Sequence, residues 1–345
     1  MGNGILYLDG EKLIINGTYN ESYDPDLIMI KFNGEVNNWF DTISPPSVQV
    51  IQFNFNKASI SYTGQYMLFA NLSNTSQNSN YGTDTWVQLP VGRFAATTSY
   101  TGQHQGSCST RRVAISNDYG VTFPNSGLTY KGDNSILRDI DMSDDGRFQL
   151  VVGVGSSYDG ATGSNKEYFL RSTDTGLTWT EERSYLYNHN CCAISGDGRY
   201  QWAFSSAVAT YSNNYGATWS QKSVMVGTDS LINDCAISTD GKYIIYSMYS
   251  NSGTRGILVS NDNGTSWANP LSIISWNCDM SSDGRVMIGG SNTEVYISND
   301  YGVNWTLQTD PLVYGGAVVA VSGDGTTFLV GADNIGNDRV KIGTI

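Results

Sequence analysis

Four aspartates that recur at fixed distances before a repeated serine have the residue type and spacing needed to bind a metal ion. Each lies four or two residues before the serine of an S-x-D-G motif, and the four are Asp139, Asp141, Asp234 and Asp279. Residues two apart on a strand face the same side, so we expect these carboxylates to converge on a central channel. Converging carboxylates raise one another's pKa or bind a cation such as Ca²⁺. The alternative is a water-filled channel in which the acids accept backbone hydrogen bonds.

Aromatic side chains in the variable segments between repeats are candidates for binding a sugar or a protein. Trp276 is the one tryptophan in such a segment, and it is joined there by Tyr130, Tyr185, Tyr187 and Tyr314. Indole and phenol rings are large amphipathic surfaces that are frequent at binding hot spots. We expect these five residues to contribute to a ligand site, with Trp276 as the anchor. The alternative is that the tyrosines only cover the edges of sheets.

Acidic residues in variable segments could instead supply the carboxylate pair of a glycoside hydrolase. The candidates are Asp159, Glu167, Glu181 and Glu182. Such a pair must lie about 5 to 10 Å apart in a cleft. The two histidines, His104 and His189, are isolated in the sequence and predict neither a zinc site nor a catalytic triad. No nucleophile elbow, P-loop or dinucleotide fingerprint is present, so no catalytic residue is assigned.

An octet, S-x-D-x-G-x-x-W, is spelled repeatedly along the chain. It begins at Ser172, Ser212, Ser260 and Ser298, and the copy at Ser116 ends in Phe123. In tight hairpin turns Gly supplies the positive φ, while Asp, Asn and Ser accept backbone N–H bonds. We therefore interpret the third residue of each octet as a structural turn residue: Asp118, Asp174, Asn214, Asp262 and Asp300.

The S-x-D-G motif alternates with the octet and sets the period of the chain. Its serines, including looser copies, are residues 61, 99, 143, 195, 238, 281 and 322, which are 38 to 52 residues apart. This is the period of a four-stranded propeller blade. The residues three and one before five of these serines (143, 195, 238, 281 and 322) are apolar, so Cys192, Cys235 and Cys278 are expected to be buried. Both motifs should form turns on one face, which leaves the variable segments on the opposite face for binding.

The octet resembles the Asp-box, or BNR repeat, of the sialidase-like propellers, and the resemblance runs from about residue 60 to the end of the chain. It implies that the octet is a structural turn remote from any active site. Sialidases of this superfamily use an arginine triad, a Tyr nucleophile with a Glu partner, and an acidic general acid. An early arginine of that set belongs to an F/Y-R-I-P motif, which this chain lacks; the nearest string is "GRFAA" at 92–96. No sialidase catalytic residue is therefore carried over.

The sequence predicts an all-β protein forming one seven-bladed β-propeller of four-stranded blades. Residues 46–345 supply seven repeats of about 43 residues, and the last ends in "DRVKIGTI", a third strand without a fourth. We expect residues 1–45 to supply the missing outer strand and close the ring, from either "GILYL" or "LIMIKFNGEVNNWF". The rival is an eight-bladed ring in which residues 5–45 form their own blade.

Composition narrows the function classes. The net charge is −13, and no Lys/Arg cluster exists beyond Arg111 and Arg112, which argues against nucleic-acid binding. Neither a signal peptide nor a membrane segment is recognised, and an odd count of five Cys argues against a disulfide framework. We expect a cytoplasmic or virion-associated protein.

Two classes of function remain open. The favoured one is a non-catalytic binding or scaffolding propeller for a glycan or a protein, lectin-like or part of a virion surface, with calcium as the only suggested cofactor. The alternative is a glycoside hydrolase with an unusual carboxylate pair. The two differ in whether two reactive carboxylates share a cleft.

Overall fold

The computed structural model describes most of the repeat region and short parts of the N-terminal region, and statements below on contacts and on their absence refer to these residues. They are 4–8, 11–15, 38–41, 55–71, 76–80, 86–89, 95–109, 112–123, 125–129, 136–158, 165–181, 189–205, 208–224, 230–250, 255–273, 275–291, 293–308, 317–332 and 339–344. The described elements are all β-strands. None of the described residues forms a helix long and apolar enough to cross a membrane. The chain divides into two units, Met1–Glu35 with Ile345, and Val36–Thr344.

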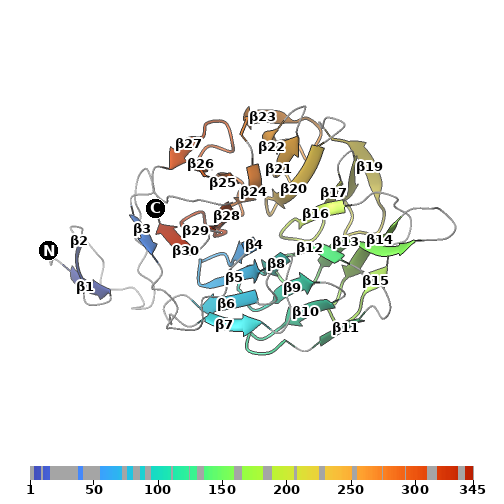
Figure 1. The fold of residues 1–345 in the computed structure, drawn as a ribbon, viewed down its shortest axis with the longest axis horizontal. Coiled ribbons are helices and arrows are strands. Elements are labelled where there is room, and N and C mark those ends of the chain that lie inside the picture. The colour runs from blue at the N-terminus through green and yellow to red at the C-terminus, as the bar shows by residue number, and fades with distance from the viewer. Residues whose placement is uncertain are drawn as a thin grey trace. The chain divides into compact units, whose positions relative to one another are not determined.

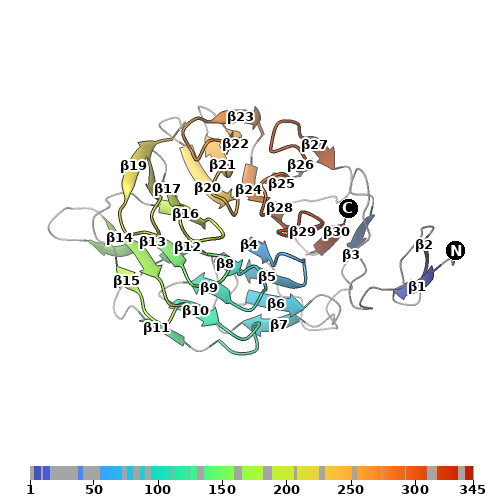
Figure 2. The ribbon, with the colours of Figure 1, turned by 180° about the vertical axis from the view of Figure 1, so that it is seen from behind.

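Six antiparallel sheets of the larger unit are each built from four consecutive strands (Figure 1). The first three are β4 (Phe55–Ile60), β5 (Tyr66–Asn71), β6 (Ser76–Asn80) and β7 (Trp86–Leu89); β8 (Ala95–Thr98), β9 (Gln105–Ser109), β10 (Arg112–Ser116) and β11 (Asn125–Thr129); and β12 (Ile136–Met142), β13 (Gln149–Tyr158), β14 (Asn165–Ser172) and β15 (Thr180–Glu181). The next three are β16 (His189–Ile194), β17 (Gln201–Ser205), β18 (Val208–Ser212) and β19 (Ser220–Ser223); β20 (Ser230–Ile237), β21 (Ile244–Ser250), β22 (Gly256–Ser260) and β23 (Ala268–Leu271); and β24 (Ser275–Met280), β25 (Met287–Ser291), β26 (Val295–Ser298) and β27 (Thr306–Gln308). The first strand of each sheet contacts the first strands of its neighbours, so the sheets surround a centre as in a β-propeller (Figures 1 and 2).

A further four-stranded sheet joins the two ends of the larger unit. It contains β28 (Ala317–Val321), β29 (Thr327–Ala332), β30 (Arg339–Thr344) and, as its outer strand, β3 (Asn38–Asp41). Trp39 pairs with Gly343 and Phe40 with Ile342. The string "LIMIKFNGEVNNWF" therefore contains the strand that pairs with β30, whereas "GILYL" forms β1 (Gly4–Leu8) and pairs with β2 (Glu11–Ile15). The described residues of 5–45 fall into two sheets: β1 and β2 pair with each other in a two-stranded sheet, and β3 belongs to the sheet of β28 to β30.

The S-x-D-G turns are linked to one another by backbone hydrogen bonds. The residue that follows each motif serine donates its N–H to the equivalent residue of the next repeat, at 2.8–3.1 Å: Tyr62 to Tyr100, Tyr100 to Asp144, Asp144 to Gly196, Gly196 to Thr239, Thr239 to Ser282, and Ser282 to Gly323. Asp324 N–H returns to Tyr62 O at 2.9 Å. This last bond joins the final repeat to the first, so the hydrogen bonds run around the whole ring.

Each octet folds as a self-contained turn. Ser172 Oγ donates to Asp174 Oδ1 at 2.8 Å and accepts from Gly176 N at 3.0 Å, and Asp174 also accepts from Thr178 N at 2.8 Å. The other predicted turn residues, Asp118, Asn214, Asp262 and Asp300, each accept the same two bonds, from the octet serine hydroxyl and from the N–H four residues on. Hydrogen bonds from Ser266 to Asp262 lower the pKa of that carboxyl to about 2. The hydrogen bonds of these side chains are therefore made within their own turns.

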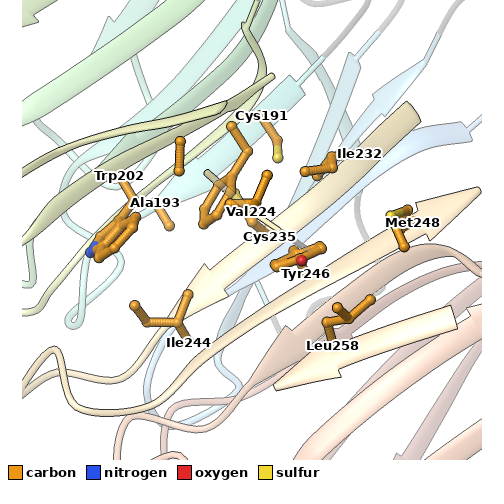
Figure 3. Close-up of a cluster of buried hydrophobic side chains, with 12 residues drawn as sticks. Cys191, Ala193, Trp202, Val224, Ile232, Cys235, Ile244, Tyr246, Met248 and Leu258 are labelled. Atoms are coloured by element: carbon orange, nitrogen blue, oxygen red, sulfur yellow. The ribbon is translucent and has the colours of Figure 1, made fainter. Parts of the chain in front are cut away.

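The hydrophobic core lies between adjacent sheets. In the cluster of Figure 3, Trp202 of β17 is only 1% exposed and stacks on Tyr211 at 4.7 Å between ring centroids. The cluster continues into the next sheet through Ile244 and Tyr246. All five cysteines are free and buried, which confirms the prediction for Cys192, Cys235 and Cys278.

Candidate functional site

The two turn motifs mark one face of the ring, which we call the turn-side face. An octet residue of each of five repeats donates a backbone hydrogen bond to the S-x-D-G turn of its own sheet, as Thr175 N does to Arg147 O at 3.2 Å. The innermost strands run toward this face and end at the motif serines. Their starting ends therefore lie at the opposite end of the channel, as predicted.

A β-bulge interrupts five of the innermost strands near these starting ends. The register shifts by one residue in β4, β12, β16, β20 and β24, while β8 and β28 pair without a shift. The extra residues are Asn56, Arg138, Asn190, Asn233 and Trp276. A bulge leaves its extra residue out of the ladder and re-aims side chains. The bulges thus distinguish this end of the channel, which we call the bulge-side mouth.

A cavity of about 300 Å³ opens at the bulge-side mouth. Its walls carry Arg138, Asn190, Asn233, Asn277 and Leu231. Arg138 Nη1 donates to Asn190 Oδ1 of the next sheet, and Asn233 Nδ2 donates to Ser275 O of the sheet after its own at 3.4 Å. Leu231 is 49% exposed. The mouth therefore combines a guanidinium, several amides and an apolar surface.

Lys57 forms the floor of this cavity. Its ammonium lies 2.7 Å from Asp139 Oδ1 and 3.1 Å from Asp234 Oδ1, and its side chain is 18% exposed. Burial alone would lower the pKa of Lys57, but the carboxylates of Asp139 and Asp234 outweigh it and raise that pKa well above its usual value. Lys57, four residues before Ser61, occupies the repeat position that holds Asp139 and Asp234 in other sheets. Sequence reasoning missed it because only the acids at this position were compared.

The four aspartates named from the sequence all line the channel and join neighbouring sheets. One oxygen of each accepts a backbone N–H from the next innermost strand: Asp139 from Cys192 at 2.8 Å, Asp141 from Ile194 at 2.7 Å, Asp234 from Cys278 at 3.2 Å and Asp279 from Val321 at 2.9 Å. The four aspartates thus bond as in the alternative drawn from the sequence, in which the channel acids accept backbone hydrogen bonds. No group of three or more His, Cys, Asp or Glu in the described part of the chain could hold a metal ion. The cation that contacts Asp139 and Asp234 is Lys57, and a calcium effect on stability stays a prediction.

The channel continues on the other side of Lys57 as a smaller cavity of about 140 Å³. Lys57 and Asp234 line both cavities. At the turn-side end, Tyr62 and Tyr100 stack with ring centroids 4.0 Å apart. Burial raises the pKa of Asp139 to about 6 and that of Asp279, which forms no ion pair with a described residue, to about 7.

The raised pKa of Asp279 predicts how the stability of the protein changes with pH. Because the pKa of Asp279 is raised above 3.8 to about 7, the folded state holds a proton that the unfolded state has lost between these values. We expect the melting temperature to rise as the pH falls from 8 to 5, and Asp279→Asn to flatten this slope. Melting curves of both proteins at several pH values test this, and parallel curves would contradict it.

The aromatic candidates divide between described and undescribed residues. Trp276 lies on β24 at the bulge and not in a loop, which corrects the sequence interpretation. Its ring is half-buried and stacks on Tyr249 at 5.4 Å, and its buried indole N–H has no acceptor among the described residues. The tyrosines Tyr130, Tyr185, Tyr187 and Tyr314 lie outside the described residues. Trp276 thus lies at the bulge-side end of β24, and the residue next to it, Asn277, lines the cavity.

The hydrolase candidates gain no reactive pair from the described residues. Glu181 lies on the outer strand β15, away from the channel, and Asp159, Glu182 and the side chain of Glu167 lie outside the described part. In the channel, both oxygens of Asp139 already accept hydrogen bonds from Lys57 and from backbone N–H groups. A carboxylate engaged in this way is poorly suited to protonate a leaving group or attack a sugar.

The two histidines also have structural partners. His189 is buried and pairs with Thr210 Oγ1 at 3.0 Å, and His104 Nδ1 lies 2.7 Å from Asn117 Oδ1. The cavity residues that the sequence interpretation missed are Lys57, Arg138, Asn190 and Asn233. Their signal was the repeat itself, because they occupy equivalent positions four or five residues before a motif serine.

Comparison of the sequence with models of known protein families and with curated proteins gives no match. The resemblance to the Asp-box propellers therefore rests on the octets and their turns alone, and what the structure establishes is an all-β chain with a β-propeller arrangement.

Proposed function

We propose that this protein is a non-catalytic binding propeller of seven blades, closed by β3, that holds a glycan at the bulge-side mouth. Two features support the blade count: seven four-stranded sheets, and the ring of hydrogen bonds through the S-x-D-G turns. The glycan is favoured over a protein ligand because the mouth is a concave cavity. Such cavities with a few convergent polar groups suit small ligands, whereas protein interfaces of standard size are broad.

The observation that carries the proposal is the set of bulges around the cavity. Bulges next to active sites re-aim side chains, and here they occur at Arg138, Asn190 and Asn233, which line the cavity, and at Trp276, whose neighbour Asn277 lines it. Amide and guanidinium groups supply directional hydrogen bonds to hydroxyls, and an indole supplies an apolar face for a sugar ring. Acid–base chemistry is disfavoured because the channel carboxylates are bound to Lys57 and to backbone N–H groups.

Trp276→Ala is expected to weaken glycan binding about ten-fold or more, the range of hot-spot truncations. A glycan array finds the ligand, and calorimetry compares the dissociation constants. Trp219→Ala is the matched control, because Trp219 is also half-buried but belongs to an octet on the turn-side face. We expect Trp219→Ala to lower stability and leave affinity unchanged. Equal loss of affinity in both variants would contradict the site assignment.

The same preparation should be tested on a panel of glycosidase substrates. The proposal expects glycan binding without turnover. Turnover that is lost on substitution of Asp159, Glu167 or Glu182 would favour the hydrolase alternative. If the ligand is a protein and not a glycan, the glycan array is expected to give no hits.

A further inference from the structure

Arg138, the cation in the wall of the bulge-side mouth, is only weakly engaged by the described residues. Arg138 is half-buried, and its one hydrogen bond to a described residue goes to the neutral Asn190 Oδ1. A guanidinium carries five N–H donors in a fixed fork. Burial lowers the pKa of Arg138, because a partly desolvated guanidinium loses hydration. Most of its donors therefore meet no acceptor in the described part of the chain and can bond a ligand or water.

The acids of the same cavity are already paired with another cation. Asp139 binds Lys57 through both oxygens, at 2.7 and 2.8 Å, and Asp234 binds Lys57 at 3.1 Å. Each of them also accepts a backbone N–H from the following sheet. No described carboxylate forms an ion pair with Arg138. Two carboxylates thus neutralise Lys57 at the floor of the cavity, whereas no described carboxylate neutralises Arg138 in its wall.

We propose that Arg138 binds a carboxylate group of the ligand, with Asn190 and Asn233 bonding the polar groups next to that carboxylate. This inference rests on the proposed function and names the chemical class of its ligand. A carboxylate fits the guanidinium fork with two parallel hydrogen bonds, which are shorter and stronger than bonds between neutral groups. The cavity of about 300 Å³ holds one unit the size of a sugar or an amino acid.

The size of the cavity allows two sources of the carboxylate, a sugar acid or an acylated amino acid. Matched pairs of small probes distinguish them: glucuronate with glucuronamide, and N-acetylglycine with N-acetylglycinamide. Each amide keeps the shape of its acid and removes the charge. Binding to the full chain is measured by ligand-observed NMR and by calorimetry.

We expect at least one acid to bind the wild-type protein ten-fold or more tightly than its amide. Arg138→Gln should remove this preference, and Arg199→Gln, an exposed arginine of the turn-side face, should retain it. The melting temperature of each variant shows whether it is folded. If Arg138→Gln does not fold, the ratio of the dissociation constants of the acid and its amide for the wild-type protein still tests the inference.

Equal binding of acid and amide, or no binding of either acid, would overturn the inference. If neutral glycans then still bind through Trp276, the proposed function stands and only its ligand class is wrong. If neither glycans nor probes bind, both proposals fail.

Discussion

Lys57→Met is expected to lower the free energy of unfolding at pH 7 by about 3 to 5 kcal/mol, the cost of removing one partner of a buried ion pair. The substitution keeps the length of the side chain and removes the ammonium between Asp139 and Asp234. Those side chains are 2% and 5% exposed, so water cannot replace the lost charge. Urea unfolding followed by circular dichroism measures the difference.

Two controls separate charge from packing in this experiment. At pH 5, below the pKa of about 6 of Asp139 in the wild-type protein, that carboxyl is largely protonated and the cost of Lys57→Met should shrink. Adding Asp139→Asn and Asp234→Asn to Lys57→Met should recover part of the stability. A loss below about 1 kcal/mol, typical of exposed pairs, would show that Lys57 does not hold the centre of the ring.

Trp202→Ala is expected to cost about 3 to 5 kcal/mol, as for other large-to-small substitutions of buried aromatic residues. Trp202 packs between Phe204 and Tyr211 of its own sheet. Its ring also covers Gly264 of the next sheet, where a Cβ would come within 2.4 Å of the indole. The substitution therefore opens a cavity between two sheets.

The matching comparison is Trp267→Ala in the octet of the next sheet. Trp267 is half-buried and packs edge-on against Tyr246 at 4.8 Å. Trp219 and Trp267 are only half-buried, so replacing either by Ala is expected to cost about 2 to 3 kcal/mol, less than for the fully buried Trp202. Denaturant unfolding ranks the variants, and glycan affinity should be unchanged in all of them. A larger loss for Trp267→Ala than for Trp202→Ala would contradict the packing account.

The sequence was sufficient to predict the all-β propeller and its turns, because both depend on local and repeated signals. The octet of Asp174 carries in eight residues every group that its turn needs. The outer strand of the last sheet was harder, because strand pairing between distant segments has no local signal. Two segments were candidates, and β3 pairs with β30 while β1 forms a local hairpin with β2.

Period two predicted that the acids face the channel, and the alternative drawn from the sequence named backbone N–H groups as their partners, but Lys57 was not foreseen. Lys57 stands at the aligned position in the first repeat, and its role appears only when the ring brings β4 near β12 and β20. The bulges were missed for a different reason. A bulge breaks the alternation of buried and exposed residues, so Trp276 was assigned to a variable segment and not to a strand.

The most direct test of the account is the structure of the protein bound to the best glycan from the array. The account predicts the sugar in the cavity of the bulge-side mouth, in contact with Arg138 and Asn233 and beside Trp276. A ligand bound at the turn-side face, on the octets or over the stacked Tyr62 and Tyr100, would contradict it.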